Sequence, residues 1–154
     1  MTLRTWVKWG GPVTAASFRI QGPQDGRLTI ALTGDFDVVT AENLEREVVV
    51  LIGPLGPSSI VAIFNLCELL EFTMYARAPL VRLQQALAKK ARRTVYFADR
   101  ARFRGLGLLI AHLAEDPNAR AVMTLEQQEA WLAGSNGRVA DAEARSQAAF
   151  AGGK

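Results

Sequence analysis

The residues whose chemistry a site could use are concentrated in one stretch, CELLEFTMYARAPLVRL, which spans residues 67–83. It holds the chain's one thiol, at Cys67, and two hydroxyls, at Thr73 and Tyr75, where an apolar run gives way to a helical pattern. The start of a helix offers backbone amides that have no acceptor within the helix, so a phosphate can bind there. The stretch therefore suggests two roles, a site of modification and a contact surface.

Catalysis and metal binding have little support in the sequence. His112 is the single histidine and Cys67 the single cysteine, so the chain alone cannot supply a histidine pair or a Cys/His zinc set. Cys67 has no histidine near it in sequence that could activate its thiol. No two carboxylates stand at a spacing that suits acid–base catalysis. We therefore expect no enzyme activity, no cofactor and no metal.

Composition indicates a soluble domain. Apolar residues make up 49% and charged residues 21% of the 154 residues. The longest strongly apolar run, 48–52, is too short to span a bilayer, and no apolar segment has the length of a signal peptide. A single cysteine fits a reducing compartment. We expect a cytoplasmic protein without direct membrane insertion.

The charges are unevenly distributed along the chain. Residues 25–71 hold eight acids and two bases, whereas residues 73–113 hold nine bases and Asp99 as their single acid. The basic segment could attract an acidic partner, or it could form a solvated helix face and a basic connecting loop. No aromatic residues interleave with these bases as stacking platforms, so nucleic acid is not an expected partner.

Hydrophobic periodicity predicts a hairpin followed by strands that alternate with helices, which implies a mostly parallel sheet. The predicted strands are 17–20, 27–34, 58–66, 93–98 and 120–123. The predicted helices are 40–52, one from about residue 77, 103–114 and 124–133. Within the third helix, the two glycines of GLG at 105–107 are expected to permit close packing on the sheet.

Capping residues set the expected limits of two helices. Thr40 is the predicted N-cap of the first helix, with Asp35 and Asp37 as loop or cap residues before it. Pro79 lacks an amide hydrogen and is tolerated only in the first turn of a helix. We therefore expect the regular part of the second helix to begin near residue 77 rather than 74.

Three segments resemble the STAS family, whose type members are anti-sigma-factor antagonists. TGDFDVVTAENL (33–44) resembles the family's GELD-x-x-TA signature, and IVAIFNLCEL (60–69) is similar to its central strand. ARFRGLGLLIAHL and VMTLEQQEAWLA are similar in pattern to its last two helices. The resemblance implies an α/β fold with a mixed, mostly parallel sheet of about five strands and about four helices on one side. We expect an N-terminal extension (1–15), a STAS-like domain (16–133) and a flexible Ala-rich tail (134–154).

The resemblance also places the family's phosphoswitch within the opening stretch. In phosphorylated members a D-S-S-G motif opens the helix after the central strand, and its first serine takes phosphate from a partner kinase. Counted from Asn65, the four motif positions hold Thr73, Met74, Tyr75 and Ala76, so none is kept. Met74 has no hydroxyl to accept phosphate. Thr73 is either a displaced phosphoacceptor or a helix cap, and Met74 and Tyr75 either form a contact surface or pack into the core.

The sequence-based hypothesis is a non-catalytic STAS-like protein–protein interaction module in a bacterial regulatory complex, without the usual phosphorylatable serine. Its partner would be a regulatory kinase-like, anti-sigma-like or scaffold protein, and a homo-oligomer is a further option. Two alternatives stay open: a phosphorylation-controlled anti-sigma-factor antagonist that uses Thr73, and the cytosolic STAS subunit of a membrane lipid transporter. The expected partner-binding residues are Phe72, Thr73, Met74, Tyr75, Arg77 and Arg82.

Overall fold

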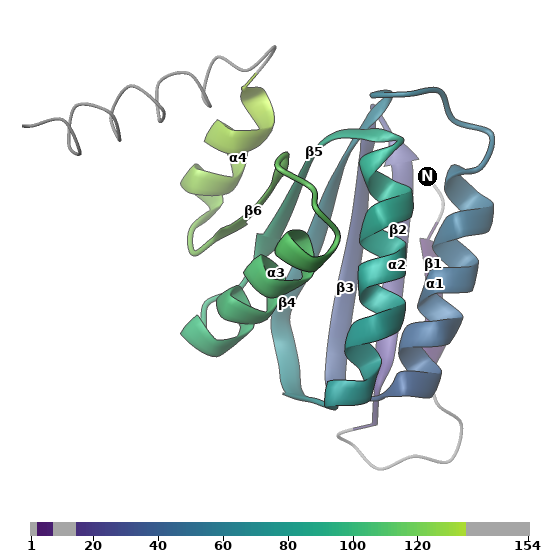
Figure 1. The fold of residues 1–154 in the computed structure, drawn as a ribbon, viewed down its shortest axis with the longest axis vertical. Coiled ribbons are helices and arrows are strands. Elements are labelled where there is room, and N and C mark those ends of the chain that lie inside the picture. Colours follow the sequence, from purple (N-terminus) through teal and green to yellow (C-terminus); the bar gives the residue numbers. More distant parts are fainter. Residues whose placement is uncertain (1–2, 8–14, 135–154) are drawn as a thin grey trace, which may run out of the picture.

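A computed structural model describes residues 3–7 and 15–134 of the chain. Strands and helices alternate through most of it, as Figure 1 shows. The strands are β1 (Leu3–Val7), β2 (Ser17–Gln24), β3 (Arg27–Phe36), β4 (Ile60–Phe72), β5 (Ala91–Phe97) and β6 (Ala119–Val122). The helices are α1 (Val38–Ile52), a 3₁₀ turn η1 (Met74–Ala76), α2 (Arg77–Ala88), α3 (Ala101–Leu113) and α4 (Leu125–Ala133).

The strands form one mixed sheet whose order follows the chain, from β1 at one edge to β6 at the other. β1, β2 and β3 pair antiparallel, and the pairs from β3 to β6 are parallel. Helices α1, α2 and α3 connect the parallel strands, as parallel pairing requires. The expected α/β class with a mixed, mostly parallel sheet is confirmed.

The sheet of the described residues has six strands rather than about five, because the first strand lies in the segment expected to be an extension. β1 pairs with β2 from Leu3 opposite Gln21 to Val7 opposite Ser17. Its sequence, LRTWV, does not alternate apolar and polar residues, so the pattern does not predict a strand there. The expected tail lies, from residue 135 on, outside the described residues.

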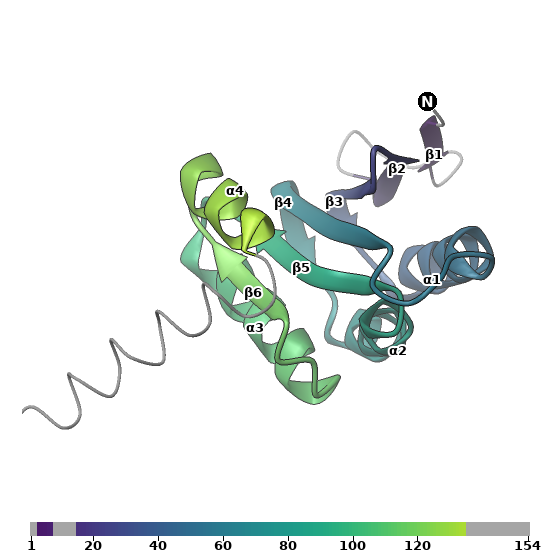
Figure 2. The ribbon, with the colours of Figure 1, turned by 90° about the horizontal axis from the view of Figure 1, so that it is seen from above.

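The helices cover both faces of the sheet. Figure 2 shows α1, α2 and α3 on one face and α4 on the other. The larger core lies under the three helices and includes Ile30, Ala62 and Phe64. Because neighbouring strand residues point to opposite faces, Val61 and Ile63 belong to a second, smaller core with Trp131 of α4. The placement of α4 therefore corrects the expectation of about four helices on one side.

A tyrosine on β5 holds two helices against the sheet. Tyr96 stacks on Phe64 with ring centroids 4.6 Å apart, and its hydroxyl donates to Gln84 of α2. The Gln84 amide donates in turn to Asp116, which lies just beyond α3, at 2.8 Å. All three polar side chains are buried, and burial raises the pKa of Tyr96 well above its ordinary value of 10. These hydrogen bonds satisfy polar groups that would otherwise be costly to bury.

Helix α3 crosses Tyr96 at a glycine. A Cβ on Gly107 would lie 2.6 Å from the Cβ of Tyr96, whereas a Cβ on Gly105 would meet nothing within 4 Å. The expected role of the two glycines in close packing therefore holds for Gly107 and not for Gly105.

We expect Gly107→Ala to lower the free energy of unfolding by about 1–3 kcal/mol, because the added methyl group overlaps Tyr96. Gly105→Ala is the matched control on the same helix, and it should leave stability unchanged or raise it by up to about 1 kcal/mol. Urea unfolding followed by circular dichroism measures both variants. Equal effects of the two substitutions would contradict the close contact.

Candidate functional site

The candidate site lies where β3 and β4 end side by side and the chain turns into helices. Phe36 and Phe72 are paired in register, and their rings stack with centroids 6.3 Å apart. The amide of Thr73 donates to the carbonyl of Phe36 at 3.0 Å, which closes the sheet at this end. Phe36 is fully buried and Phe72 half-buried. Phe72, an expected partner-binding residue, therefore packs on Phe36 directly before the turn that begins at Met74.

The turn η1 presents two large side chains to solvent. Met74 is 72% exposed and Tyr75 is 79% exposed, whereas Ala76 is fully buried. Of the two alternatives left open for Met74 and Tyr75, burial in the core is wrong. Because Ala76 is buried and Thr73 is bonded to Phe36, the two exposed residues stand on a turn that is fixed at both ends.

The regular helix α2 begins at Arg77, as the position of Pro79 predicts. Pro79 is its third residue, where an amide hydrogen would have no acceptor within the helix. The residues between the sheet and α2 form a tighter 3₁₀ turn, and the Arg77 amide donates to the carbonyl of Met74. Thr73 occupies the N-cap position of that turn, but its side chain makes no capping hydrogen bond. The alternative that Thr73 caps the helix through its side chain is therefore wrong.

Asp37 begins the neighbouring helix α1. Its side chain accepts hydrogen bonds from the amide of Thr40 at 2.9 Å and from the hydroxyl of Thr40 at 2.6 Å. The N-cap is thus Asp37, and the expected N-cap Thr40 lies three residues inside the helix, where it is fully buried. Asp35 lies in β3 opposite Glu71 and is neither a loop nor a cap residue.

Two exposed apolar residues near the junction were missed in the sequence. Val39, at the start of α1, is 51% exposed, and α1 packs against η1. Leu70, two residues before Phe72 on β4, is 39% exposed. Each is one of two consecutive apolar residues, Val38–Val39 and Leu69–Leu70, and the sequence does not show which of the two is exposed. Together with Met74 and Tyr75 they add apolar surface around the end of the sheet.

The basic residues expected to face a partner differ in their surroundings. Arg82 forms two hydrogen bonds with the carboxylate of Glu45 on α1, at 2.9 and 3.0 Å. This pair spans α1 and α2, so Arg82 supports their packing. Arg77 is half-buried at the start of α2, directly after η1. Arg77 is therefore the better placed of the two beside Met74 and Tyr75.

Part of the basic segment hydrogen-bonds to backbone carbonyls. Four of its side chains donate to main-chain oxygens at the ends of other elements. They are Lys90 to Leu55 at 2.5 Å, Arg92 to Leu132 at 3.2 Å, Arg102 to Leu70 at 2.6 Å and Arg104 to Asp99 at 2.9 Å. These bonds satisfy carbonyls that helices and strands leave without a partner at their ends.

β4 extends past β5, and side chains protect its free edge. Its pairing with β5 ends at Asn65, while its pairing with β3 continues through two bulges to Phe72. The Asn65 side chain accepts from the amide of Cys67 at 2.9 Å. Burial raises the pKa of the Cys67 thiol, which lowers its thiolate fraction and its reactivity. Such bulges limit pairing with other chains at an exposed strand edge.

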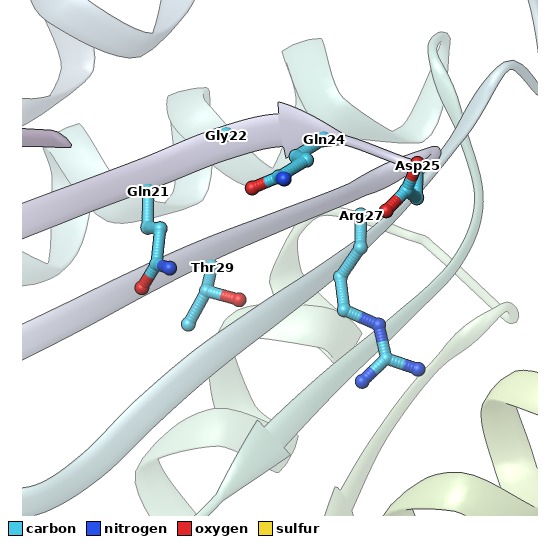
Figure 3. A pocket seen from close by; sticks show the side chains of 6 residues that line it. All are labelled: Gln21, Gly22, Gln24, Asp25, Arg27 and Thr29. Atoms are coloured by element: carbon cyan, nitrogen blue, oxygen red, sulfur yellow. The ribbon is translucent and has the colours of Figure 1, made fainter. Parts of the chain in front are cut away.

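A polar hollow of about 500 Å³ lies at the opposite end of the strands, at the β2–β3 hairpin, and Figure 3 shows its lining. Arg27 lines it and already binds Glu129 of α4 through two hydrogen bonds at 2.8 and 3.1 Å. The remaining lining residues are Gln21, Gly22, Gln24, Asp25 and Thr29. None of the expected site residues lies there. Within residues 3–7 and 15–134, no group of three or more His, Cys, Asp or Glu residues could hold a metal ion.

Comparison with solved structures places this arrangement among known folds. An uncharacterized DUF3478-family protein from Shewanella loihica PV-4, with a SpoIIAA-like fold, matches 81% of this chain and 99% of its own at 14% identity and TM-score 0.59. An anti-sigma factor antagonist from Mycobacterium paratuberculosis matches 80% and 98% at 15% identity and TM-score 0.56. The chain has a STAS-like fold.

The anti-sigma factor antagonist SpoIIAA in its unphosphorylated form shares the STAS-like fold as well, over 77% of this chain and 99% of its own, at 15% identity and TM-score 0.52. No family model and no curated protein matches the sequence. No helix in the described part of this STAS-like domain has the length and apolar character needed to cross a membrane.

We expect Asp37→Ala to lower the free energy of unfolding of the STAS-like domain by about 1 kcal/mol, because it removes the N-cap of α1 and leaves the Thr40 hydroxyl without its acceptor. Asp37→Asn is the matched control, since its side-chain carbonyl can still accept both hydrogen bonds. Thermal unfolding of both variants tests this assignment. A fully stable Asp37→Ala variant would contradict it.

Proposed function

We propose that this protein is a non-catalytic interaction module of a bacterial regulatory complex in the cytoplasm, and that η1 and the start of α2 form its partner-binding surface. The observation that carries the proposal is the exposure of Met74 and Tyr75, 72% and 79%, on a turn held by the sheet. A tyrosine and a flexible methionine on a fixed support are residue types that protein interfaces favour. The STAS-like fold, shared with two anti-sigma factor antagonists, supports the regulatory part of the proposal.

Some side chains of the proposed surface hold it in place, and others contact the partner. Phe72 stacks on Phe36 and Arg82 binds Glu45, so these two hold the surface in place. Met74 and Tyr75 reach the partner, with Arg77 beside them as a charge for an acidic group. Because Met74 carries no hydroxyl, phosphate at that position does not control the association, which is constitutive or governed by the partner.

We expect Met74→Asp and Tyr75→Ala each to weaken the complex at least about tenfold, because an interface centre tolerates neither a buried unpaired charge nor the loss of an aromatic anchor. The measurement is affinity purification from the native organism with quantitative mass spectrometry. Circular dichroism confirms that the variants fold, since both side chains are exposed.

Val50→Asp is the matched control for this experiment, because Val50 is 70% exposed on α1 and lies outside the junction. It should leave the recovered partner unchanged. Partners that remain bound to both junction variants would contradict the proposed surface. Recovery of a transporter ATPase as the junction-dependent partner would favour the lipid-transporter alternative.

One observation favours a second candidate, an anti-sigma-factor antagonist controlled through Thr73. The Thr73 side chain is exposed and makes no capping hydrogen bond, so its hydroxyl is accessible to a kinase. A phosphate there would add about 1.5–2 negative charges close to Arg77 and Met74.

If Thr73 is the acceptor, phosphoproteomics of the native protein should find phosphate on the peptide that contains Thr73. Thr73→Val should remove that signal and leave the fold intact. Its complete absence under all growth conditions would exclude this candidate and leave the constitutive module.

A further inference from the structure

The outer side of α3 carries leucines that the fold leaves uncovered. Leu108 is 54% exposed, Leu109 38% and Leu113 42%, whereas Gly107 and Ile110 on the inner side are buried. Residues four apart lie on one side of a helix, so Leu109 and Leu113 are neighbours and Leu108 adjoins them. An open hollow of about 720 Å³ continues this apolar side toward the start of β6.

β6, which packs against α3, is a sheet edge. Among residues 3–7 and 15–134, no strand pairs with its outer side. The unpaired amides and carbonyls of an edge strand can pair with another strand. Two copies of the same edge fit each other when they run antiparallel, which is the arrangement that a two-fold axis produces.

The charges of α3 favour the same antiparallel arrangement. Arg100 and Arg102 lie at its beginning, Arg102 with an exposed ion pair to Glu71 at 3.5 Å, and the exposed Glu115 lies just beyond its end. The helix has 13 residues, a length of about 20 Å. Two antiparallel copies would bring the basic end of one helix near the acidic end of the other. The midpoint between Arg102 and Glu115 falls at Leu108 and Leu109.

We propose that this chain forms a symmetric dimer in which β6 pairs antiparallel with β6 of a second copy and the exposed leucines of α3 pack against the same leucines of that copy. A second copy of the chain is supported by three features: the unpaired edge of β6, the exposed leucines of α3 and the opposite charges at the two ends of that helix. The dimer does not rest on the proposed function, since no residue of η1 belongs to its surface.

The first test is analytical ultracentrifugation of the full chain over a series of concentrations. The expected mass approaches twice the 16.8 kDa of one chain. Leu108→Asp should weaken the association at least about tenfold, because it places a charge at the centre of the contact. Val50→Asp on α1, at 70% exposure, is the matched control and should dimerise like the unchanged protein, as should Tyr75→Ala.

A charge exchange tests the antiparallel geometry. Arg102→Glu and Glu115→Arg should each weaken the dimer, and the double variant should restore it. Arg102 also binds the carbonyl of Leu70 and pairs with Glu71 of β4 at 3.5 Å, so circular dichroism must show that each variant keeps its fold. Arg102 and Glu115 lie at opposite ends of α3, about 20 Å apart, so they do not contact each other within one chain. Restoration by the double variant therefore reports a contact between two chains.

Three results would overturn the proposal. The first is the mass of a single chain at every concentration, and the second is a dimer that Leu108→Asp leaves unchanged. The third is hydrogen exchange in which the amides of β6 that point away from β5 stay unprotected at concentrations at which the chain is dimeric, because the two β6 edges would then not be paired.

Discussion

The paired ends of β3 and β4 are the contact on which the candidate site depends. The stacked rings of Phe36 and Phe72 and the hydrogen bond from Thr73 to Phe36 fix where both strands stop. One residue after Phe36, Asp37 begins α1, and directly after Thr73 the chain enters η1. The pairing of the β3 and β4 ends thereby sets where α1 and η1 begin. It also places Met74 and Tyr75 on an exposed turn.

A second contact holds the other half of the domain. Tyr96 lies where β5, α2 and α3 meet, and its ring requires a glycine on α3 while its hydroxyl requires Gln84 on α2. Polar groups buried in such a place specify a geometry more strictly than apolar packing does, because each must keep its hydrogen-bond partner. The position of α3, and with it the outward direction of its leucines, depends on this contact.

The sequence predicted the elements whose pattern is local and long. The buried strands β4 and β5 and the start of α2 at Arg77 follow from apolar runs and from one proline. The side of α4 was not predictable in the same way, because a helix pattern does not reveal which face of a sheet it will cover. The pairing of Arg82 with Glu45 joins residues 37 positions apart, and only the packing of α1 on α2 brings them together. The N-cap was misplaced because Asp37 and Thr40 are both good capping residues, and backbone geometry selects the first.

The basic side chains that bind carbonyls have two effects, a local hydrogen bond and a long-range electric field, and the two respond differently to salt. Lys90, Arg92 and Arg104 hold the ends of loops and helices through hydrogen bonds to neutral oxygens, so these contacts depend little on salt. Their positive charges are not cancelled by those oxygens, and the field that they create beyond the surface is screened within about 8 Å at physiological ionic strength. Ionic strength can therefore change how fast an acidic molecule approaches this half of the domain while leaving its local structure as it is.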